Sequence, residues 1–134
     1  MKKILLLLVF VSLLACDSEG DGGDLSQGVG PWNLINIKGG VDNIDVDIDR
    51  DQITWSFNDL SLTLFVVNNI GGIPTGVGDG MHEFSIEESG NELFLYIDGA
   101  EYGALTIGTN TLTVDQTVTS NGTSADEYTL LFVR

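Results

Sequence analysis

Apolar and polar residues alternate in short segments of this chain, and that period of two constrains its fold more than any other feature. Ile53, Trp55 and Phe57 alternate with polar neighbours, which predicts a strand with one apolar face. The alternation resumes after Asn58-Asp59, a dipeptide typical of hairpin turns. The apolar positions of that next strand are Leu60, Leu62, Leu64 and Val66.

Eight short strands are expected, separated by breaks rich in glycine, asparagine and aspartate, which favour turns. They cover residues 32–38, 53–58, 60–66, 81–87, 92–97, 101–107, 111–118 and 127–134, with an extra piece at 41–48. From Gly28 onward the chain is long enough for one domain and not for two. The glycine-rich stretch from Asn68 to Gly80 is expected to form a long, mobile loop at one rim.

Sequential strands with one apolar face each leave few architectures, because sheet edges must be paired or hidden. The sequence shows no pattern typical of a long amphipathic helix that could cover a sheet. A closed, antiparallel, up-and-down β-barrel meets the requirement with eight strands, or nine with the extra piece. The predicted fold class is therefore all-β.

The N-terminal residues form a distinct segment of their own composition. Two lysines at positions 2 and 3 precede an apolar run from Ile4 to Leu14, which is too short to span a bilayer. Ala15 and then Cys16, the sole cysteine, follow this run. The segment resembles the lipobox of bacterial lipoproteins, which implies removal of residues 1–15 and acylation of Cys16 by chains such as palmitate. An ordinary signal peptide with a chance cysteine is the alternative.

Residues 16–29 mix carboxylates with glycine and are expected to form a disordered tether. The acids that follow Cys16 resemble a signal for export to the outer surface of the outer membrane. Asp17 directly after the cysteine also resembles an inner-membrane retention signal. Cell-surface exposure on the outer membrane is therefore the expectation, with a periplasm-facing or inner-membrane location as the alternative.

Charge excludes one class of partner. Loss of Lys2 and Lys3 would leave three of the five cations against twenty carboxylates. Nucleic acid requires a clustered basic face, so it is excluded as a partner. Anionic lipid headgroups would also repel the domain. The expected partner is therefore the membrane, through the acyl chains on Cys16, and the domain is expected to be a monomer.

Residues at both ends of the expected barrel resemble those of lipocalins. Gly30-Pro31-Trp32 is similar to the Gly-x-Trp signature of the first lipocalin strand, and Phe132-Val133-Arg134 is similar to the last strand. The resemblance covers residues 30–134 and implies that Arg134 packs over Trp32 and closes the barrel base. Pro31 at the x position departs from the pattern, and the chain is shorter than full lipocalins. Any cavity is therefore expected to be shallow.

Residue types limit the chemistry. His82 is the sole histidine, and Cys16 would be consumed by lipid, so we expect no enzyme, zinc site or cofactor. A calcium site is one interpretation of the three aspartates at alternate positions, Asp45, Asp47 and Asp49. However, Arg50 and Ser56 stand where a calcium loop needs its glycine and its bidentate glutamate. A solvated outer strand face is the preferred interpretation of the three aspartates.

Two functions from different classes remain. The first is a binding module that takes a small apolar ligand at the barrel mouth. The candidate lining residues are Trp55, Phe57, Leu64, His82, Phe84, Ile86, Leu95 and Ile97. The second is a non-catalytic structural or interaction component of the cell envelope with a barrel filled by side chains. An eight-stranded barrel is wide enough for either.

Overall fold

The computed structural model describes residues 31–134, so the predicted signal, Cys16 and tether lie outside the described residues. All of the regular secondary structure in residues 31–134 consists of β-strands. Residues 31–134 include no helix of the length and hydropathy needed to cross a membrane.

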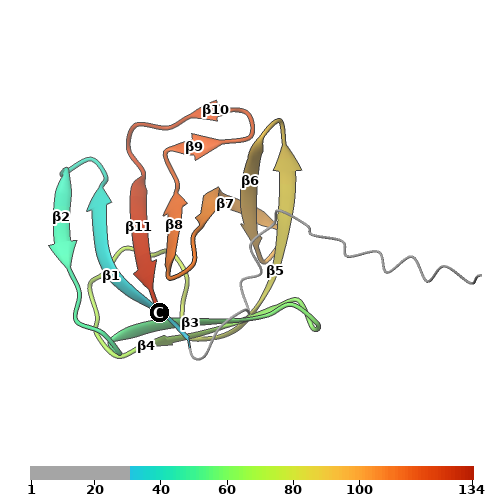
Figure 1. Ribbon diagram of the computed structural model, residues 1–134. Coiled ribbons are helices and arrows are strands. Elements are labelled where there is room, and N and C mark those ends of the chain that lie inside the picture. Colours follow the sequence, from blue (N-terminus) through green and yellow to red (C-terminus); the bar gives the residue numbers. More distant parts are fainter. Residues whose placement is uncertain (1–30) are drawn as a thin grey trace, which may run out of the picture.

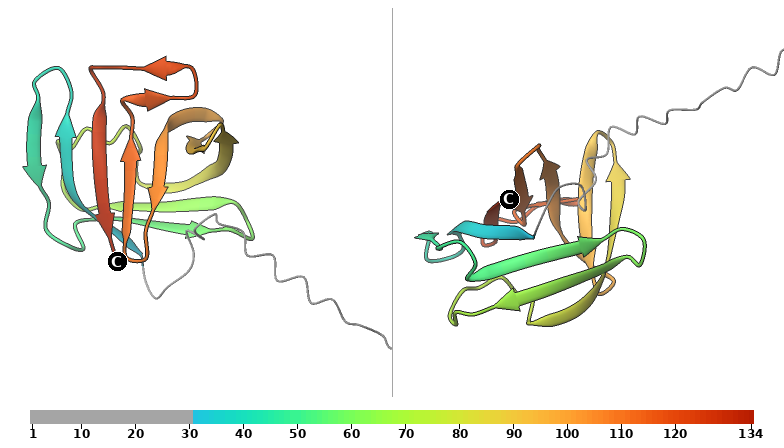
Figure 2. Two further views of the ribbon diagram at one scale, coloured as in Figure 1. Left: turned by 45° about the horizontal axis from the view of Figure 1, so that its top comes forward. Right: turned by 60° about the horizontal axis from the view of Figure 1, so that its bottom comes forward.

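Eight of the strands close into an antiparallel barrel, which confirms the predicted fold class (Figures 1 and 2). The ring order is β1-β3-β4-β5-β6-β7-β8-β11, and β11 pairs with β1 to close it. The strands are β1 (Trp32–Gly39), β2 (Ile44–Asp47), β3 (Ile53–Asn58), β4 (Thr63–Asn68), β5 (Gly80–Ser89), β6 (Glu92–Ile97), β7 (Ala100–Ile107), β8 (Thr111–Asp115), β9 (Val118–Thr119), β10 (Gly122–Thr123) and β11 (Tyr128–Val133).

The extra piece predicted at 41–48 is β2, which pairs with the second half of β1. Asn36 to Gly39 of β1 pair with β2, whereas Trp32 and Asn33 pair with β3. Thus β2 and β3 follow one another along β1 as one interrupted strand. Asn33 stabilises the backbone between β2 and β3. Its buried side-chain oxygen accepts a hydrogen bond from the Asp51 backbone at 2.9 Å.

The connections between strands gather mainly at two ends of the barrel. One end holds the start of β1, the end of β11 and the short turns after β3 and β7, at the bottom of Figure 1; we call it the closed end. The other end holds the turn after β1, the long connection from β4 to β5, the turn after β6 and the β9–β10 hairpin. We call it the loop end.

Alternate strand residues fill the interior with large apolar side chains. Trp32, Trp55 and Phe132 are the largest of the fully buried residues. The Trp55 ring lies 4.8 Å from Phe132 and 6.2 Å from Phe57, measured between centroids. Such tilted and edge-on contacts are favourable beyond simple burial.

Two predicted strand boundaries are wrong. The turn after β3 spans residues 59–62 rather than Asn58-Asp59 alone, so Leu60 and Leu62 lie in the turn and are exposed. The cause is Asn58, whose side-chain oxygen accepts hydrogen bonds from the backbones of Leu60 and Ser61, an arrangement that competes with strand pairing.

The second error concerns residues 111–118, predicted as one strand. β8 ends at Asp115, because its carboxylate accepts hydrogen bonds from the backbone and hydroxyl of Thr117. Val118 then starts the separate β9–β10 hairpin.

Candidate functional site

The closed end is sealed by the residues that resemble the lipocalin ends. Trp32 is 1% exposed, and the Arg134 guanidinium carbon lies 4.1 Å from the centroid of its ring. The Arg134 backbone donates to the Asn110 carbonyl at 3.2 Å, which holds the chain terminus in place. This geometry is that of a cation–π contact and leaves the loop end as the candidate entrance.

The predicted ligand-lining residues face the interior but pack against one another. Six of them are buried, and Ile86 is partly buried against the same core. The rings of Phe57 and Phe84 meet edge-on at 5.0 Å. The buried six are Trp55, Phe57, Leu64, Phe84, Leu95 and Ile97. His82 shares their inward orientation but lies at the loop end with a partly exposed side chain.

The connection from β4 to β5 folds into the loop end. We call residues 69–79 the plug loop. Thr75 and Val77 are 3% and 8% exposed, and Val77 belongs to the core cluster. The hydroxyl of Tyr102 on β7 donates to the Thr75 carbonyl at 2.5 Å. The predicted loop therefore exists, but its inner residues are packed; its mobility stays a prediction.

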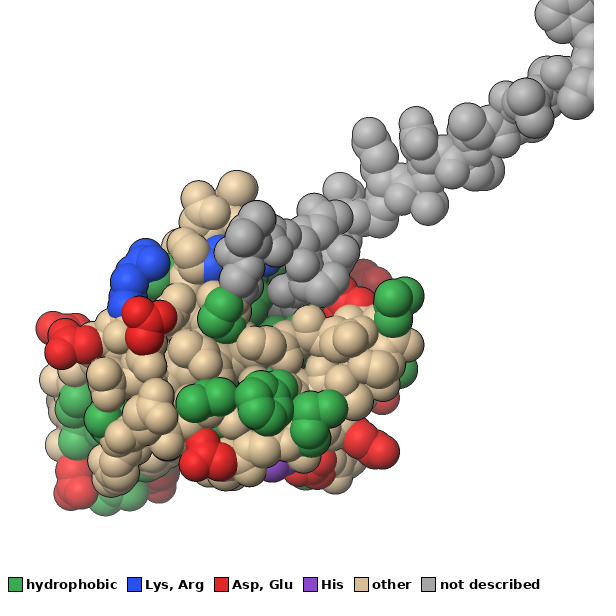
Figure 3. Space-filling view, turned by 90° about the horizontal axis from the view of Figure 1, so that it is seen from below, with side chains coloured by type: hydrophobic (Ala, Val, Ile, Leu, Met, Phe, Trp, Pro, Cys, Tyr) green, Lys and Arg blue, Asp and Glu red, His purple; other side chains and the backbone are tan. Residues whose placement is uncertain are grey.

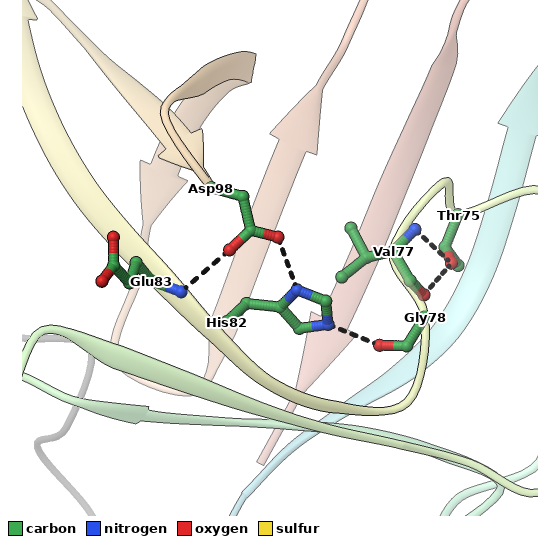
Figure 4. Close-up of polar contacts among 6 residues, drawn as sticks. All are labelled: Thr75, Val77, Gly78, His82, Glu83 and Asp98. Carbon is green, nitrogen blue, oxygen red and sulfur yellow. Dashed lines mark hydrogen bonds and ion pairs between the residues drawn. The ribbon is translucent and has the colours of Figure 1, made fainter.

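His82 holds the second contact of the plug loop (Figure 4). Its Nε2 lies 2.6 Å from the Gly78 carbonyl, and its Nδ1 lies 2.7 Å from an Asp98 carboxylate oxygen. Both partners are acceptors, so both contacts form together only when the imidazole carries two protons. The hydrogen bond to Asp98, and then that to Gly78, raises the pKa of His82 above 6.5. We call this arrangement the His82 latch.

Asp98 is positioned by the turn between β6 and β7. Its other carboxylate oxygen accepts a hydrogen bond from the Glu83 backbone at 3.1 Å. The hydrogen bonds from His82 and Glu83 lower the pKa of Asp98 below 3.8. The sequence signalled this residue only as part of a turn, because its pairing with His82 depends on the register of β5 and β6.

Trp55 carries an unpaired polar atom. Among the described residues, its indole nitrogen is the buried side-chain polar atom without a hydrogen-bond partner. The Trp55 ring lies 5.6 Å from that of Tyr102, the residue that holds Thr75. A buried donor without an acceptor costs about 1 to 3 kcal/mol, so this position favours an acceptor group beside it.

The alternating aspartates lie on the outer face near β2. The side-chain amide of Asn36 donates to Asp45 at 2.8 Å and to Asp47 at 2.9 Å. Asp49 is exposed beyond the end of β2. Within residues 31–134, no three side chains of metal-ligating type are grouped so that they could hold an ion.

Two surface hollows lie at the loop end, outside the barrel interior. One of about 350 Å³ lies between the β1–β2 turn and residues 117–129, and its lining includes Lys38, Asp45 and Glu127. Another of about 200 Å³ lies beside Glu101 and Tyr102. Polar groups dominate the lining of the larger hollow, so it does not suit the expected apolar ligand.

Comparison with known proteins assigns no family. No protein-family model, curated protein or solved structure matches this chain significantly.

Proposed function

We propose that this protein is a membrane-anchored, non-catalytic lipoprotein whose barrel binds a small apolar molecule under the plug loop. Acyl chains on Cys16 would attach it to the outer membrane, with the domain at the cell surface. The interior beneath Thr75 and Val77 would hold the ligand, and the indole nitrogen of Trp55 would donate to an acceptor group on it.

One observation carries the binding proposal: the loop end of the interior is filled by a connection and not by strands. Thr75 and Val77 occupy positions that could be vacated without breaking any strand pairing of the barrel. Hydrogen bonds from Tyr102 and His82 hold the loop in place. Loops of this kind open at low free-energy cost compared with a strand ladder.

Ligand binding is tested by titration with Nile red, a neutral, apolar dye. The phenol of Tyr102 would oppose opening, so Tyr102→Phe should tighten dye binding by up to about tenfold, the equivalent of one hydrogen bond. Tyr96→Phe is the matched control, because the Tyr96 hydroxyl contacts Glu101 rather than the plug loop. Equal affinities in the two variants would reject the plug loop as a lid.

A co-purifying molecule provides the second measurement. Native mass spectrometry of protein from its own cells should detect an apolar ligand, and Phe84→Arg should expel it, because the buried ring would be replaced by a charge. Circular dichroism must show that this variant is folded. A folded wild-type protein with neither a bound molecule nor saturable dye binding would exclude the binding function.

The anchor is tested separately. Cys16→Ala should abolish metabolic labelling with palmitate, because the sole thiol is removed. Protease added to intact cells should digest the domain if it faces outward. Retained labelling would contradict the lipobox interpretation, and protection of the domain would favour the periplasm-facing or inner-membrane alternative.

A second candidate function is a structural or interaction component with a filled barrel. It is favoured by the ring contacts that join Trp55, Phe57, Phe84 and Phe132 across the interior. If the dye and native mass spectrometry experiments both give no ligand, this function takes the place of the first.

A further inference from the structure

Exposed apolar side chains gather on one outer face of the barrel. Five large apolar residues of the described part are exposed, and four of them belong to β4, β5 and the β3–β4 turn. They are Leu60 (100% exposed), Leu62 (53%), Phe65 (45%) and Met81 (66%). We call them the outer apolar row. Figure 3 shows hydrophobic side chains in line across this face, with carboxylates around them.

Strand register places the row close to the point where the tether would join the domain. Phe65 is paired with Met81 on one side and with Ser56 on the other. Ser56 follows Trp55, the partner of Trp32 at the start of β1. Phe65 therefore lies two strands from β1, about 10 Å across the barrel wall. Leu60 and Leu62 lie in the β3–β4 turn at the closed end, and Met81 lies at the start of β5, directly after the plug loop.

The row is too small to hold a second copy of the protein. A stable interface uses about 20 to 30 residues from each partner, whereas the row contains four large apolar side chains. A weak contact becomes effective when a tether keeps both surfaces together at a concentration of roughly millimolar. A membrane that holds Cys16 would meet this condition, because residues 16–30 span at most about 50 Å.

We propose that the outer apolar row rests on the lipid surface to which Cys16 is attached. This inference depends on the proposed lipid anchor and adds the orientation of the domain. The outer face of β3, β4 and β5 turns toward the membrane, and the opposite wall of β7, β8 and β11 turns toward the aqueous side. Apolar side chains at the headgroup boundary bind in proportion to their buried area.

The carboxylates beside the outer apolar row determine which lipids it can contact. Glu83 projects from the same outer face of β5 as Met81, two residues further along, and is exposed. Asp59 stands in the turn beside Leu60. These carboxylates would be repelled by anionic headgroups. The row therefore fits a neutral, zwitterionic lipid surface such as phosphatidylcholine.

The test attaches the mature chain to vesicles by chemical coupling of Cys16 to a maleimide lipid, so it does not depend on acylation in cells. The vesicles contain phosphatidylcholine with brominated acyl chains, which quench tryptophan on contact. Trp32 and Trp55 are 1% and 0% exposed, so they provide a constant background. Phe65→Trp should lose most of its added emission.

Val41→Trp is the matched control, because Val41 is 80% exposed in the turn at the loop end. Its emission should remain unquenched. In the Phe65→Trp chain, the change Leu62→Asn should reduce quenching without loss of stability, because Leu62 has a φ of 53°, which asparagine tolerates better than leucine. Replacing phosphatidylcholine partly with an anionic lipid should also reduce quenching.

Equal quenching of the Phe65→Trp and Val41→Trp chains would overturn the proposal, even if palmitate labelling shows that the anchor is real. A dimer of the uncoupled chain that dissociates with Met81→Thr would also overturn it and assign the row to a second copy. Strong quenching confined to Phe65→Trp supports the orientation, whatever the ligand experiments show.

Discussion

The closed end and the loop end of this barrel are filled in different ways. At the closed end, Trp32 belongs to the first strand, and its cover Arg134 directly follows the last strand, which pairs with the first. At the loop end, Thr75 and Val77 come from a connection and are held by hydrogen bonds from Tyr102 and His82. The closed end therefore cannot rearrange without breaking the pairing of β1 with β11. The loop end can rearrange while every strand pairing of the ring is kept.

This difference assigns stability to the closed end and ligand binding to the loop end. Strand side chains are fixed by neighbours on both sides, so their loss leaves a cavity that the barrel cannot close. Side chains of a loop are fixed by a few polar contacts, and such regions open first in native proteins. We therefore expect changes at the closed end to alter global unfolding and changes at the loop end to alter local opening and binding.

The largest effect is expected at Trp32. Trp32→Ala should lower the free energy of unfolding by about 3 to 5 kcal/mol, as truncation of large buried aromatics does. Urea denaturation followed by the remaining Trp55 measures the change. A loss below 1 kcal/mol would show that the closed end does not carry the stability of the barrel and would remove the contrast between the ends.

Substitution of two glycines tests the same difference between the barrel wall and the plug loop. A Cβ at Gly103 of β7 would stand 2.8 Å from the Asp115 carbonyl oxygen, which is backbone and cannot move aside freely. Gly103→Ala should therefore destabilise by about 1 to 3 kcal/mol. Gly71→Ala in the plug loop has no atom within 4 Å of its Cβ and should be neutral or slightly stabilising. Thermal unfolding of both variants in parallel gives the comparison.

Val77 tests whether the plug loop is part of the global core. Val77→Ala removes two buried methyl groups and should cost about 1.6 kcal/mol, at about 0.8 kcal/mol for each. It should also increase Nile red binding, because the plug becomes smaller. A loss as large as that from Trp32→Ala, without increased binding, would mean that the loop folds as one unit with the barrel wall.

The sequence predicted the ring of strands but not how its loop end is filled. Alternation and turn residues locate strands because they depend on near neighbours, and Ile53, Trp55 and Phe57 all face inward as expected. Val77 is a single apolar residue within a glycine-rich run, so no period marks it as buried. The partner of His82 is 16 positions away at Asp98, and only the β5–β6 register brings the two together.

The smallest expected effect is the pH dependence of the His82 latch, because Asp98 is exposed and solvent screens the pair. The raised pKa of His82 means that its contribution is complete below pH 6.5 and is lost as pH rises through the raised value. The lowered pKa of Asp98 means that its contribution is present above pH 3.8 and is lost as pH falls through the lowered value. The latch is therefore strongest between these limits.

Hydrogen exchange at the Thr75 and Val77 amides measures this effect, since local opening exposes them without global unfolding. After correction for intrinsic rates, exchange should accelerate as pH rises from 6.5 through the raised pKa of His82. His82→Gln should exchange quickly throughout this range and show no such acceleration, because His82 is the sole histidine. Amides of β11 at the closed end should be unaffected in both proteins. Equal acceleration at both ends would instead indicate a global change, and the plug loop would then have no latch of its own.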